Sequence, residues 1–269
     1  MKIFITGATG YVGKSLLKIL NKKKIDTYLL TRRKIRNKKF FIFYGSLENP
    51  PKEIFKMQFD ILLHLAWDNL DNYNSKNHFK TLKIHKKFLK KMLNCKIKKI
   101  IVAGTCAEYG KKDGKLREYD NVKPKSNYAI AKNNFRIYID KLIKNKNIIF
   151  NWLRIFYLYG AREPKKTLIG QLKYAIKKNK KSFKMSSGNQ YKDYVSINVL
   201  TNLIMRLIIN DYNYKIINCC SGKSLKIINL VKSYLRKKRI KIITNFYNIS
   251  KNEPINAYGS NFILKKIIK

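Results

Sequence analysis

The chain opens with an apolar run, residues 2–6, that leads into the glycine-rich segment Thr6-Gly-Ala-Thr-Gly-Tyr-Val-Gly13 and then into a helical pattern. Strand, glycine loop and helix in this order are typical of a dinucleotide-binding unit: Gly7 allows a tight turn, Gly10 lets the backbone approach a pyrophosphate, and Gly13 lets the helix pack on the strand. The free N–H groups and the dipole of the helix start favour that anion. This segment therefore predicts a parallel α/β sheet.

Further apolar runs alternate with helical patterns along the chain, at residues 27–31, 40–44, 59–67, 99–103 and 151–157. Alternation of this kind gives a doubly wound, Rossmann-type parallel sheet, and its ligands bind at the carboxyl ends of the strands. Helical stretches at 167–178 and 197–209, a strand and turn at 216–222 and the remaining residues indicate a small C-terminal α/β lobe. We predict a dinucleotide-binding domain over 1–160 and a substrate lobe over 161–269, with some crossing of the chain between them.

Tyr128 and Lys132 stand four residues apart, behind a Pro and a Ser that predict a helix start. Positions i and i+4 share a helix face, so both side chains can reach one pocket. A nearby ammonium favours the ionised phenol and would lower its pKa from about 10 toward neutrality, where it can exchange a proton with a sugar hydroxyl or carbonyl. In a chain with 18 Tyr and 60 Lys plus Arg this spacing also arises by chance, so the assignment depends on the other motifs.

The formal net charge of +45 allows two interpretations. Clustered lysines would attract nucleic acid or an anionic membrane, whereas a general bias toward Lys, Ile and Asn would spread them. The basic residues are spread along the whole chain, so we favour bias and expect no nucleic-acid partner. A basic surface would still help to gather a doubly charged nucleotide sugar.

The cysteines and the N-terminus bear on metal binding and location. The four cysteines, Cys95, Cys106, Cys219 and Cys220, show no C-x-x-C spacing, and the chain has 3 His, so we expect no metal site and reduced thiols. The first residues leave no room for a signal peptide, and no apolar run reaches about 18 residues. We expect a cytoplasmic protein without integral membrane contact.

The strand at 27–31 ends in Thr31-Arg-Arg33, without the acidic residue that would bond the adenosine ribose 2′-hydroxyl. Arg32 and Arg33 favour the 2′-phosphate of NADP(H) over NAD(H). The alternative is that they are ordinary surface arginines in a basic protein.

With these pieces in order, the chain resembles the extended short-chain dehydrogenase/reductase family, also described as the NAD-dependent epimerase/dehydratase family, over nearly its whole length. The resemblance is carried by Thr6-Gly-x-x-Gly-x-x-Gly13, His64-Leu-Ala66, Thr105 with Tyr109-Gly110, Tyr128 with Lys132, Leu153-Arg154 with Tyr159-Gly160, and Lys192-Asp193-Tyr194. It implies a Rossmann domain with a smaller C-terminal lobe, a nucleotide-diphosphate sugar as substrate, and a homodimer.

The resemblance also implies a catalytic triad: Tyr128 as acid/base, Lys132 lowering its pKa and holding the nicotinamide ribose, and Thr105 bonding the sugar C4 oxygen. We expect the cofactor to contact Gly7, Thr9, Gly10, Tyr11, Val12, Gly13, Arg32, Arg33, Ser46, Leu47, Leu65, Ala66, Tyr128, Lys132 and Ile155. We expect the substrate to contact Trp67, Thr105, Cys106, Glu108, Tyr157 and Lys192. Trp67 either packs against the sugar or base or anchors its loop; Glu108 either bonds a sugar hydroxyl or is an exposed loop carboxylate.

Departures from the family pattern narrow the reaction. Cys106-Ala107 stands where the 4,6-dehydratases carry Asp-Glu, and Ala107 where bifunctional epimerase-reductases carry Cys, so neither elimination nor C3/C5 epimerisation is supported. Hydride transfer at C4 remains. The motifs look most like those of dTDP-4-dehydro-6-deoxyglucose reductases, which form dTDP-fucose for surface polysaccharides, and next like those of CDP-linked deoxysugar synthases. The alternatives are a nucleotide-sugar 4-epimerase that retains NAD, and a non-catalytic NADP-binding protein.

Overall fold

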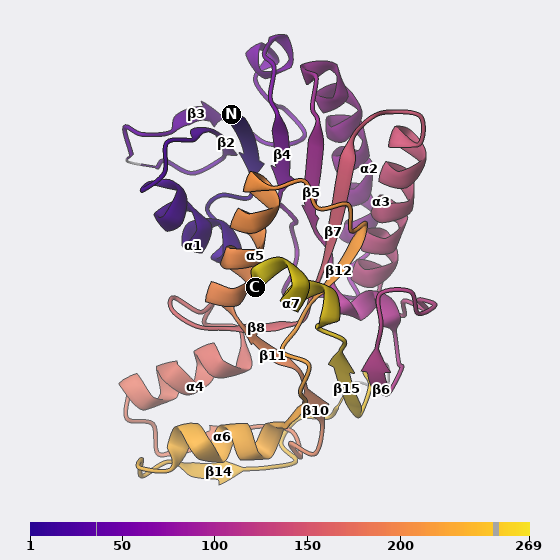
Figure 1. Cartoon of the computed structure of the whole chain (residues 1–269). Coiled ribbons are helices and arrows are strands. Elements are labelled where there is room, and N and C mark those ends of the chain that lie inside the picture. Colours follow the sequence, from indigo (N-terminus) through magenta and orange to yellow (C-terminus); the bar gives the residue numbers. More distant parts are fainter. Residues whose placement is uncertain (36, 250–252) are drawn as a thin grey trace.

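The computed structural model describes residues 1–35, 37–249 and 253–269, and a seven-stranded sheet forms its centre (Figure 1). The strands run in the order β12-β7-β5-β4-β1-β2-β3, and every neighbouring pair is parallel. Their bounds are β1 Lys2–Thr6, β2 Asp26–Thr31, β3 Phe41–Tyr44, β4 Ile61–His64, β5 Lys99–Ala103, β7 Ile149–Ile155 and β12 Ile216–Cys219. The predicted Rossmann-type α/β fold is confirmed.

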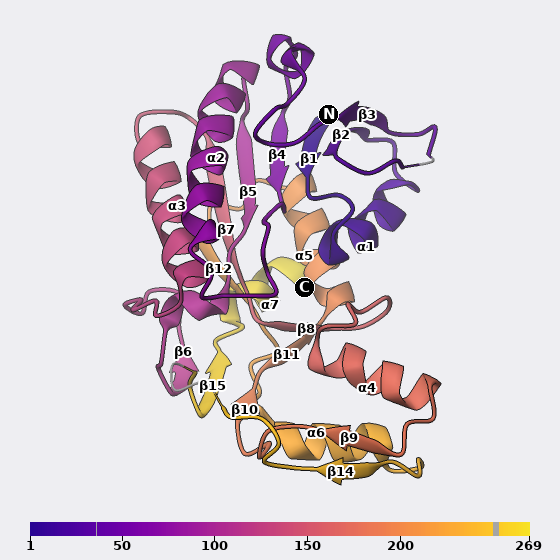
Figure 2. The same cartoon turned by 180° about the vertical axis from the view of Figure 1, so that it is seen from behind.

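Helices cover both faces of this sheet (Figures 1 and 2). One face carries α1 Tyr11–Leu20, α5 Ile197–Ile209 and α7 Phe262–Ile268, and the other carries α2 Asn77–Met92 and α3 Asn127–Ile143. In α3 the buried residues Ala131, Phe135, Ile139 and Ile143 recur every four positions and so form one apolar stripe. Because both faces are covered, the central strands are buried on both sides, as in β4, where all residues are buried.

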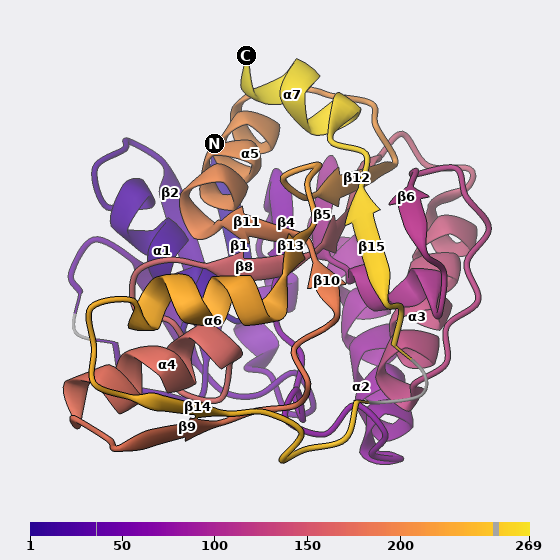
Figure 3. The same ribbon diagram turned by 90° about the horizontal axis from the view of Figure 1, so that it is seen from below.

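A smaller layer lies beyond the carboxyl ends of the strands (Figure 3). It consists of α4 Leu168–Lys177, α6 Ile227–Leu235 and the parallel pair β9 Ser182–Lys184 with β14 Lys241–Ile243, around an apolar cluster of its own. The other short elements are η1 Lys52–Lys56, η2 Leu93–Cys95, η3 Cys106–Tyr109, β6 Gly114–Leu116, β8 Tyr157–Tyr159, β10 Tyr191–Lys192, β11 Tyr194–Ser196, β13 Leu225–Lys226 and β15 Asn256–Gly259. Of these, η1 and η2 precede β4 and β5, at the amino ends of those strands and away from this layer.

The two parts of the chain exchange elements. Strand β12 and helices α5 and α7 come from beyond residue 160 yet belong to the central sheet and its covering layer, while β6 pairs with β15. The buried carboxylate of Asp193 links the segment that follows β12 and the end of β15 to the end of β10, because it accepts hydrogen bonds from Ser221 N and Oγ, Gly222 N and Gly259 N at 2.7–3.1 Å. The division at residue 160 stays a prediction about function. No helix in the described ranges is long and apolar enough to cross a bilayer.

Candidate active site

The glycine loop between β1 and α1 is shaped to receive an anion. Gly7 has φ +75°, and a Cβ there would lie 2.5 Å from the backbone nitrogen of Ala66, so any other residue would be strained and would clash. Gly10 precedes the first turn of α1 in an extended conformation; that turn has no side-chain cap and no acidic residue. The N–H groups and the positive end of the helix dipole are therefore available to a pyrophosphate, and the loop fits the dinucleotide that its sequence implies.

A cleft of about 1010 Å³ extends from this loop, past the carboxyl ends of β4 and β5, to the start of α4. All the residues predicted to contact the cofactor line it: Gly7, Thr9, Gly10, Tyr11, Val12, Gly13, Arg32, Arg33, Ser46, Leu47, Leu65, Ala66, Tyr128, Lys132 and Ile155. So do three of the residues predicted for the substrate, Trp67, Thr105 and Tyr157. A single cleft thus brings the glycine loop and the predicted triad together at the edge where parallel sheets bind ligands.

The starts of η3 and α3 position the three members of the predicted triad. Thr105 follows β5 as the cap of η3, and its hydroxyl accepts a hydrogen bond of 3.2 Å from Ala107 N. Tyr128 lies in the first turn of α3, whose cap Ser126 accepts from Ala129 N at 3.2 Å. Lys132 follows one turn later, and its Nζ donates to the carbonyl oxygen of Ala103 at 2.6 Å. All three side chains are buried.

Burial governs the ionisation of the triad. It raises the pKa of Tyr128 above its ordinary value; Tyr73 raises it further and a hydrogen bond with Thr105 opposes the rise. This is opposite to the lowering that we expected from the sequence. Burial also lowers the pKa of Lys132 to about 7, with Glu108 acting in the other direction. The phenol is therefore neutral at neutral pH, which is the form that donates a proton.

The sequence predicts that Glu108 contacts the substrate, but Glu108 does not line the cleft. Its carboxylate is fully buried and accepts hydrogen bonds from Thr105 N at 3.1 Å, Trp152 Nε1 at 2.9 Å and Arg154 Nε at 3.1 Å. Three protein donors occupy its oxygens, so Glu108 serves as a buried ion-pair partner and completes the cap of η3.

Cys106 and Lys192 also do not line the cleft, and each contacts other parts of the protein instead. Cys106 is partly buried against the cluster of Tyr109, Leu116, Phe156, Cys220 and Ala257, and burial raises the pKa of its thiol to about 12. The Lys192 ammonium forms an ion pair of 2.8 Å with Glu253 and lies 5.2 Å from the centre of the Tyr157 ring. Neither side chain has the free, cleft-facing polar group that we expected for the substrate.

The segment between β4 and α2 lines one side of the cleft, and its contacts were not predicted from the sequence. Asp68 pairs with Arg32 at 2.7 Å and Asp71 pairs with Lys166 at 2.6 Å, so the segment is tied both to the end of β2 and to the loop before α4. The Tyr73 ring stacks on that of Tyr128. These pairs join residues 36 to 95 positions apart in the chain, a range over which no sequence motif signals contact.

The three histidines of the chain lie close to the triad and to Trp67, and His85 lines the cleft. His64 Nδ1 is hydrogen-bonded to the Thr6 hydroxyl at 2.9 Å and His64 Nε2 to His85 Nδ1 at 2.7 Å. Burial lowers the pKa of His64 to about 3 and that of His85 well below its usual range, so both rings are neutral at neutral pH. His78 accepts from Trp67 Nε1 at 3.2 Å through Nδ1 and is bonded to the carbonyl oxygen of Asn72 at 2.9 Å through Nε2.

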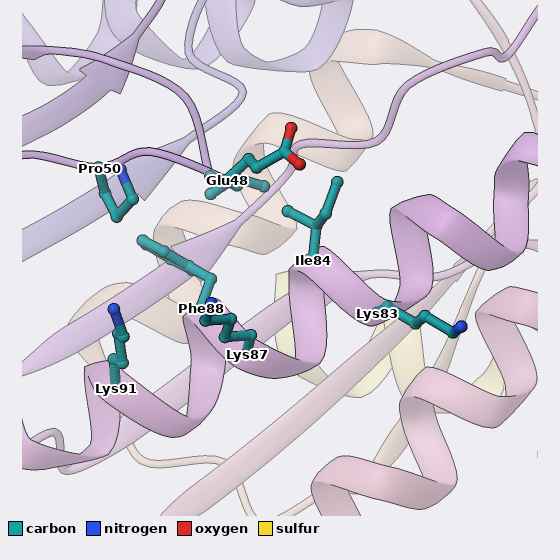
Figure 4. A pocket seen from close by; sticks show the side chains of 8 residues that line it. Glu48, Pro50, Lys83, Ile84, Lys87, Phe88 and Lys91 are labelled. Atoms are coloured by element: carbon teal, nitrogen blue, oxygen red, sulfur yellow. The ribbon is translucent and has the colours of Figure 1, made fainter.

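A small pocket of about 170 Å³ adjoins the cleft beyond the end of β3 (Figure 4). It shares Leu47, Glu48 and Ile84 with the cleft, and Lys83, Lys87 and Lys91 line it from successive turns of α2. It extends the side of the cleft that is lined by Ser46 and Leu47, two of the residues predicted to contact the cofactor.

Comparisons of the sequence with known proteins agree with this geometry. The family described as "NAD dependent epimerase/dehydratase family" matches residues 3–220. The chain is 30% identical over 270 residues to the dTDP-6-deoxy-L-talose 4-dehydrogenase (NAD(+)) of Aggregatibacter actinomycetemcomitans, covering 97% of each chain. It is 24% identical over 221 residues to the CDP-abequose synthase of Salmonella typhimurium, covering 77% of this chain and 70% of that one.

Among solved structures, MoeE5 in complex with UDP-glucuronic acid and NAD superposes with a TM-score of 0.88. The match covers 100% of this chain and 92% of that one at 16% sequence identity. At this identity the likeness supports the fold alone.

Proposed function

Because the chain belongs to the NAD-dependent epimerase/dehydratase family, we propose that it is a nucleotide-sugar oxidoreductase that reduces the C4 keto group of a nucleotide-linked 4-keto-6-deoxyhexose. The observation that carries the proposal is the placement of Thr105, Tyr128 and Lys132 in the same cleft as the glycine loop. Fold alone would not carry it, since many functions share this fold.

Each member of the triad has a role in the proposed reaction. A bound nicotinamide would supply the hydride to C4 of the sugar. The neutral Tyr128 hydroxyl donates the proton that the C4 oxygen needs, and Thr105 holds that oxygen by a hydrogen bond. Lys132 bonds the ribose hydroxyls and favours the phenolate that remains after proton transfer.

The proposed sugar class is supported by the relative that matches almost the whole chain, which is named for a dTDP-linked 6-deoxyhexose and for dehydrogenation at C4. We retain a dTDP-linked substrate on this basis. That relative is named for 6-deoxy-L-talose, whereas the sequence motifs favour a fucose product. The configuration at C4 of the product decides between a reduction that forms fucose and one that forms an epimer.

For the cofactor, the arrangement of Arg32 supports NAD(H) rather than the NADP(H) favoured by the sequence. The guanidinium is paired with Asp68 at 2.7 Å. A 2′-phosphate bound at Arg32 would lie near this carboxylate and would be repelled by it, whereas a ribose hydroxyl would not. The whole-length relative carries NAD(+) in its name.

The test is nicotinamide absorbance after the purified protein is mixed with NADH and dTDP-4-keto-6-deoxyglucose. We expect stoichiometric consumption of NADH. The 4-epimerase remains the competing assignment: it would leave added NADH unchanged and interconvert a 4-hydroxyl sugar nucleotide using tightly bound NAD. Absence of both activities over a panel of sugar nucleotides would refute the proposal.

A further inference from the structure

The Lys132 ammonium is buried between two tryptophan rings. Its Nζ lies 4.1 Å from the centre of the Trp67 ring and 5.6 Å from that of Trp152, and the residue is 2% exposed. It donates one hydrogen bond, to the carbonyl oxygen of Ala103. Among the described residues no carboxylate lies within ion-pair distance of this Nζ. The positive charge is therefore kept in the interior without a salt bridge.

A tryptophan face is the aromatic surface that attracts a cation most strongly, and the attraction grows when water is excluded. The Trp67 ring is fixed in this position, because its Nε1 donates to His78 and His78 is in turn bonded to the carbonyl oxygen of Asn72. Phe135 and His85 pack around it, with ring centres 6.1 Å and 4.7 Å away. The indole is thus held in place from several sides.

We propose that Trp67 is a positioning residue that keeps the buried Lys132 side chain cationic, with its indole face acting as the partner that a carboxylate would otherwise be. The consequence for catalysis depends on the proposed function, since a cationic Lys132 is what favours the Tyr128 phenolate and bonds the ribose. The sequence had suggested a different role for Trp67, as a wall for the sugar or a loop anchor.

The other titratable groups around Lys132 are either neutral or bonded to other protein groups. From β4 and α2, His64 and His85 face it as neutral rings, and from its own helix so does the protonated Tyr128. Glu108, from η3, is the charged carboxylate that acts on Lys132, and its oxygens are shared with Arg154 and Trp152. Because burial brings the pKa of Lys132 to about 7, a modest change at the ring face changes the charged fraction at neutral pH.

The test is a titration of the Lys132 Cε resonance by ¹³C NMR in protein labelled with [¹³Cε]lysine, assigned by its loss in Lys132→Met. Replacing tryptophan by 5-fluorotryptophan withdraws electrons from the ring face with little change in volume. We expect the acid dissociation constant of Lys132 to rise about twofold on fluorination and about three- to tenfold in Trp67→Phe, so the pKa falls in both. Thermal unfolding of each protein verifies that it is folded.

The second tryptophan provides the matched control. In the Trp67→Phe background, 5-fluorotryptophan changes only Trp152, whose ring is farther from Nζ. Fluorination there should move the pKa of Lys132 less than it does in the wild type. A pKa that is unchanged or raised on fluorination, or an equal shift in the two backgrounds, overturns the proposal.

This titration needs no substrate, so it separates the inference from the proposed function. A fall in the pKa of Lys132 together with no consumption of NADH would uphold the role of Trp67 and refute the reductase. Tyr128-dependent reduction together with a pKa that does not respond to fluorination would do the reverse.

Discussion

The backbone N–H of Tyr128 donates a hydrogen bond of 2.9 Å to the carbonyl oxygen of Tyr73, and the two phenol rings stack with their centres 4.8 Å apart. The segment before α2 therefore holds the proposed acid/base residue twice, by its backbone and by its ring. Burial is the largest cause of the raised pKa of Tyr128, and Tyr73 raises it further.

This contact predicts that the Tyr73 ring matters and its hydroxyl does not. Tyr73→Phe keeps the stacked ring, so kcat for keto-sugar reduction should stay within about twofold of wild type. Tyr73→Ala removes about 0.5–1.5 kcal/mol of ring–ring attraction and admits water, and we expect kcat to fall about tenfold. Steady-state kinetics compare the two variants; equal activity of Tyr73→Ala and Tyr73→Phe would show that the stacking has no catalytic role.

Tyr128→Phe removes the proton donor without changing the ring. We expect kcat to fall about a hundredfold or more while the affinity for NADH, followed by nicotinamide fluorescence, remains near wild type. Tyr138→Phe is the control, because it makes the same change ten positions along the same helix and outside the cleft. Full activity in Tyr128→Phe would show that the triad assignment is wrong.

Asp68→Asn should move cofactor preference toward NADP(H). The change keeps the side-chain shape but frees Arg32 and removes a charge that would repel a 2′-phosphate. Because the pair is exposed, we expect a rise of about three- to tenfold in the ratio of kcat/KM for NADPH to that for NADH. Asp71→Asn, which releases Lys166 instead, should leave the ratio unchanged; a similar ratio in both variants would argue against a role for Arg32 in cofactor choice.

Glu108→Gln tests whether this carboxylate serves the fold or the substrate. It leaves the buried Arg154 guanidinium without its charged partner, which typically costs about 3–5 kcal/mol. We expect urea unfolding to report a loss of that order, whereas Glu53→Gln, at an exposed position, should be neutral. Unchanged stability together with a raised KM for the sugar nucleotide would restore the substrate role that the sequence suggested.

The buried histidines predict how stability depends on pH. In the folded protein His64 and His85 have lowered pKa values, about 3 for His64, so the unfolded chain binds more protons below about pH 6.5. Their contribution is present above that pH and is lost as the pH falls toward 3. The free energy of unfolding, measured by urea titration from pH 7 to pH 4, should decrease less steeply in His64→Gln than in wild type. Parallel curves would show that His64 is not a neutral buried group.

Local sequence patterns predicted most strands of the sheet and two motifs of the candidate site. The helix expected over 197–209 is observed over Ile197–Ile209, and the strand expected at 99–103 is observed over Lys99–Ala103. Such elements follow from periodicity and from the apolar character of strands covered on both faces. The glycine loop and the Tyr128–Lys132 pair could be placed because each motif lies within a few residues of chain, and the matched family confirms the resemblance that they suggested.

Contacts between distant segments could not be predicted in the same way. Glu108 resembles an exposed loop carboxylate in sequence, and only the approach of β7 brings Arg154 and Trp152 to it. Arg32 suggested a phosphate site because its partner Asp68 is 36 positions away. The pKa of Tyr128 was expected in the wrong direction, since the sequence shows the nearby lysine but not the degree of burial.

The late position of β12 in the sequence affects how the protein folds while it is being synthesised. The outer edge of β7 is covered by β12, which begins at residue 216, long after the other strands. A ribosome that has released only the first 160 residues would present a nearly fully buried strand with one row of unpaired backbone groups, which is a template for pairing with another chain. Synthesis of the lobe must therefore be nearly finished before the nucleotide-binding half is safe from aggregation, and shortened versions of this protein should keep β12.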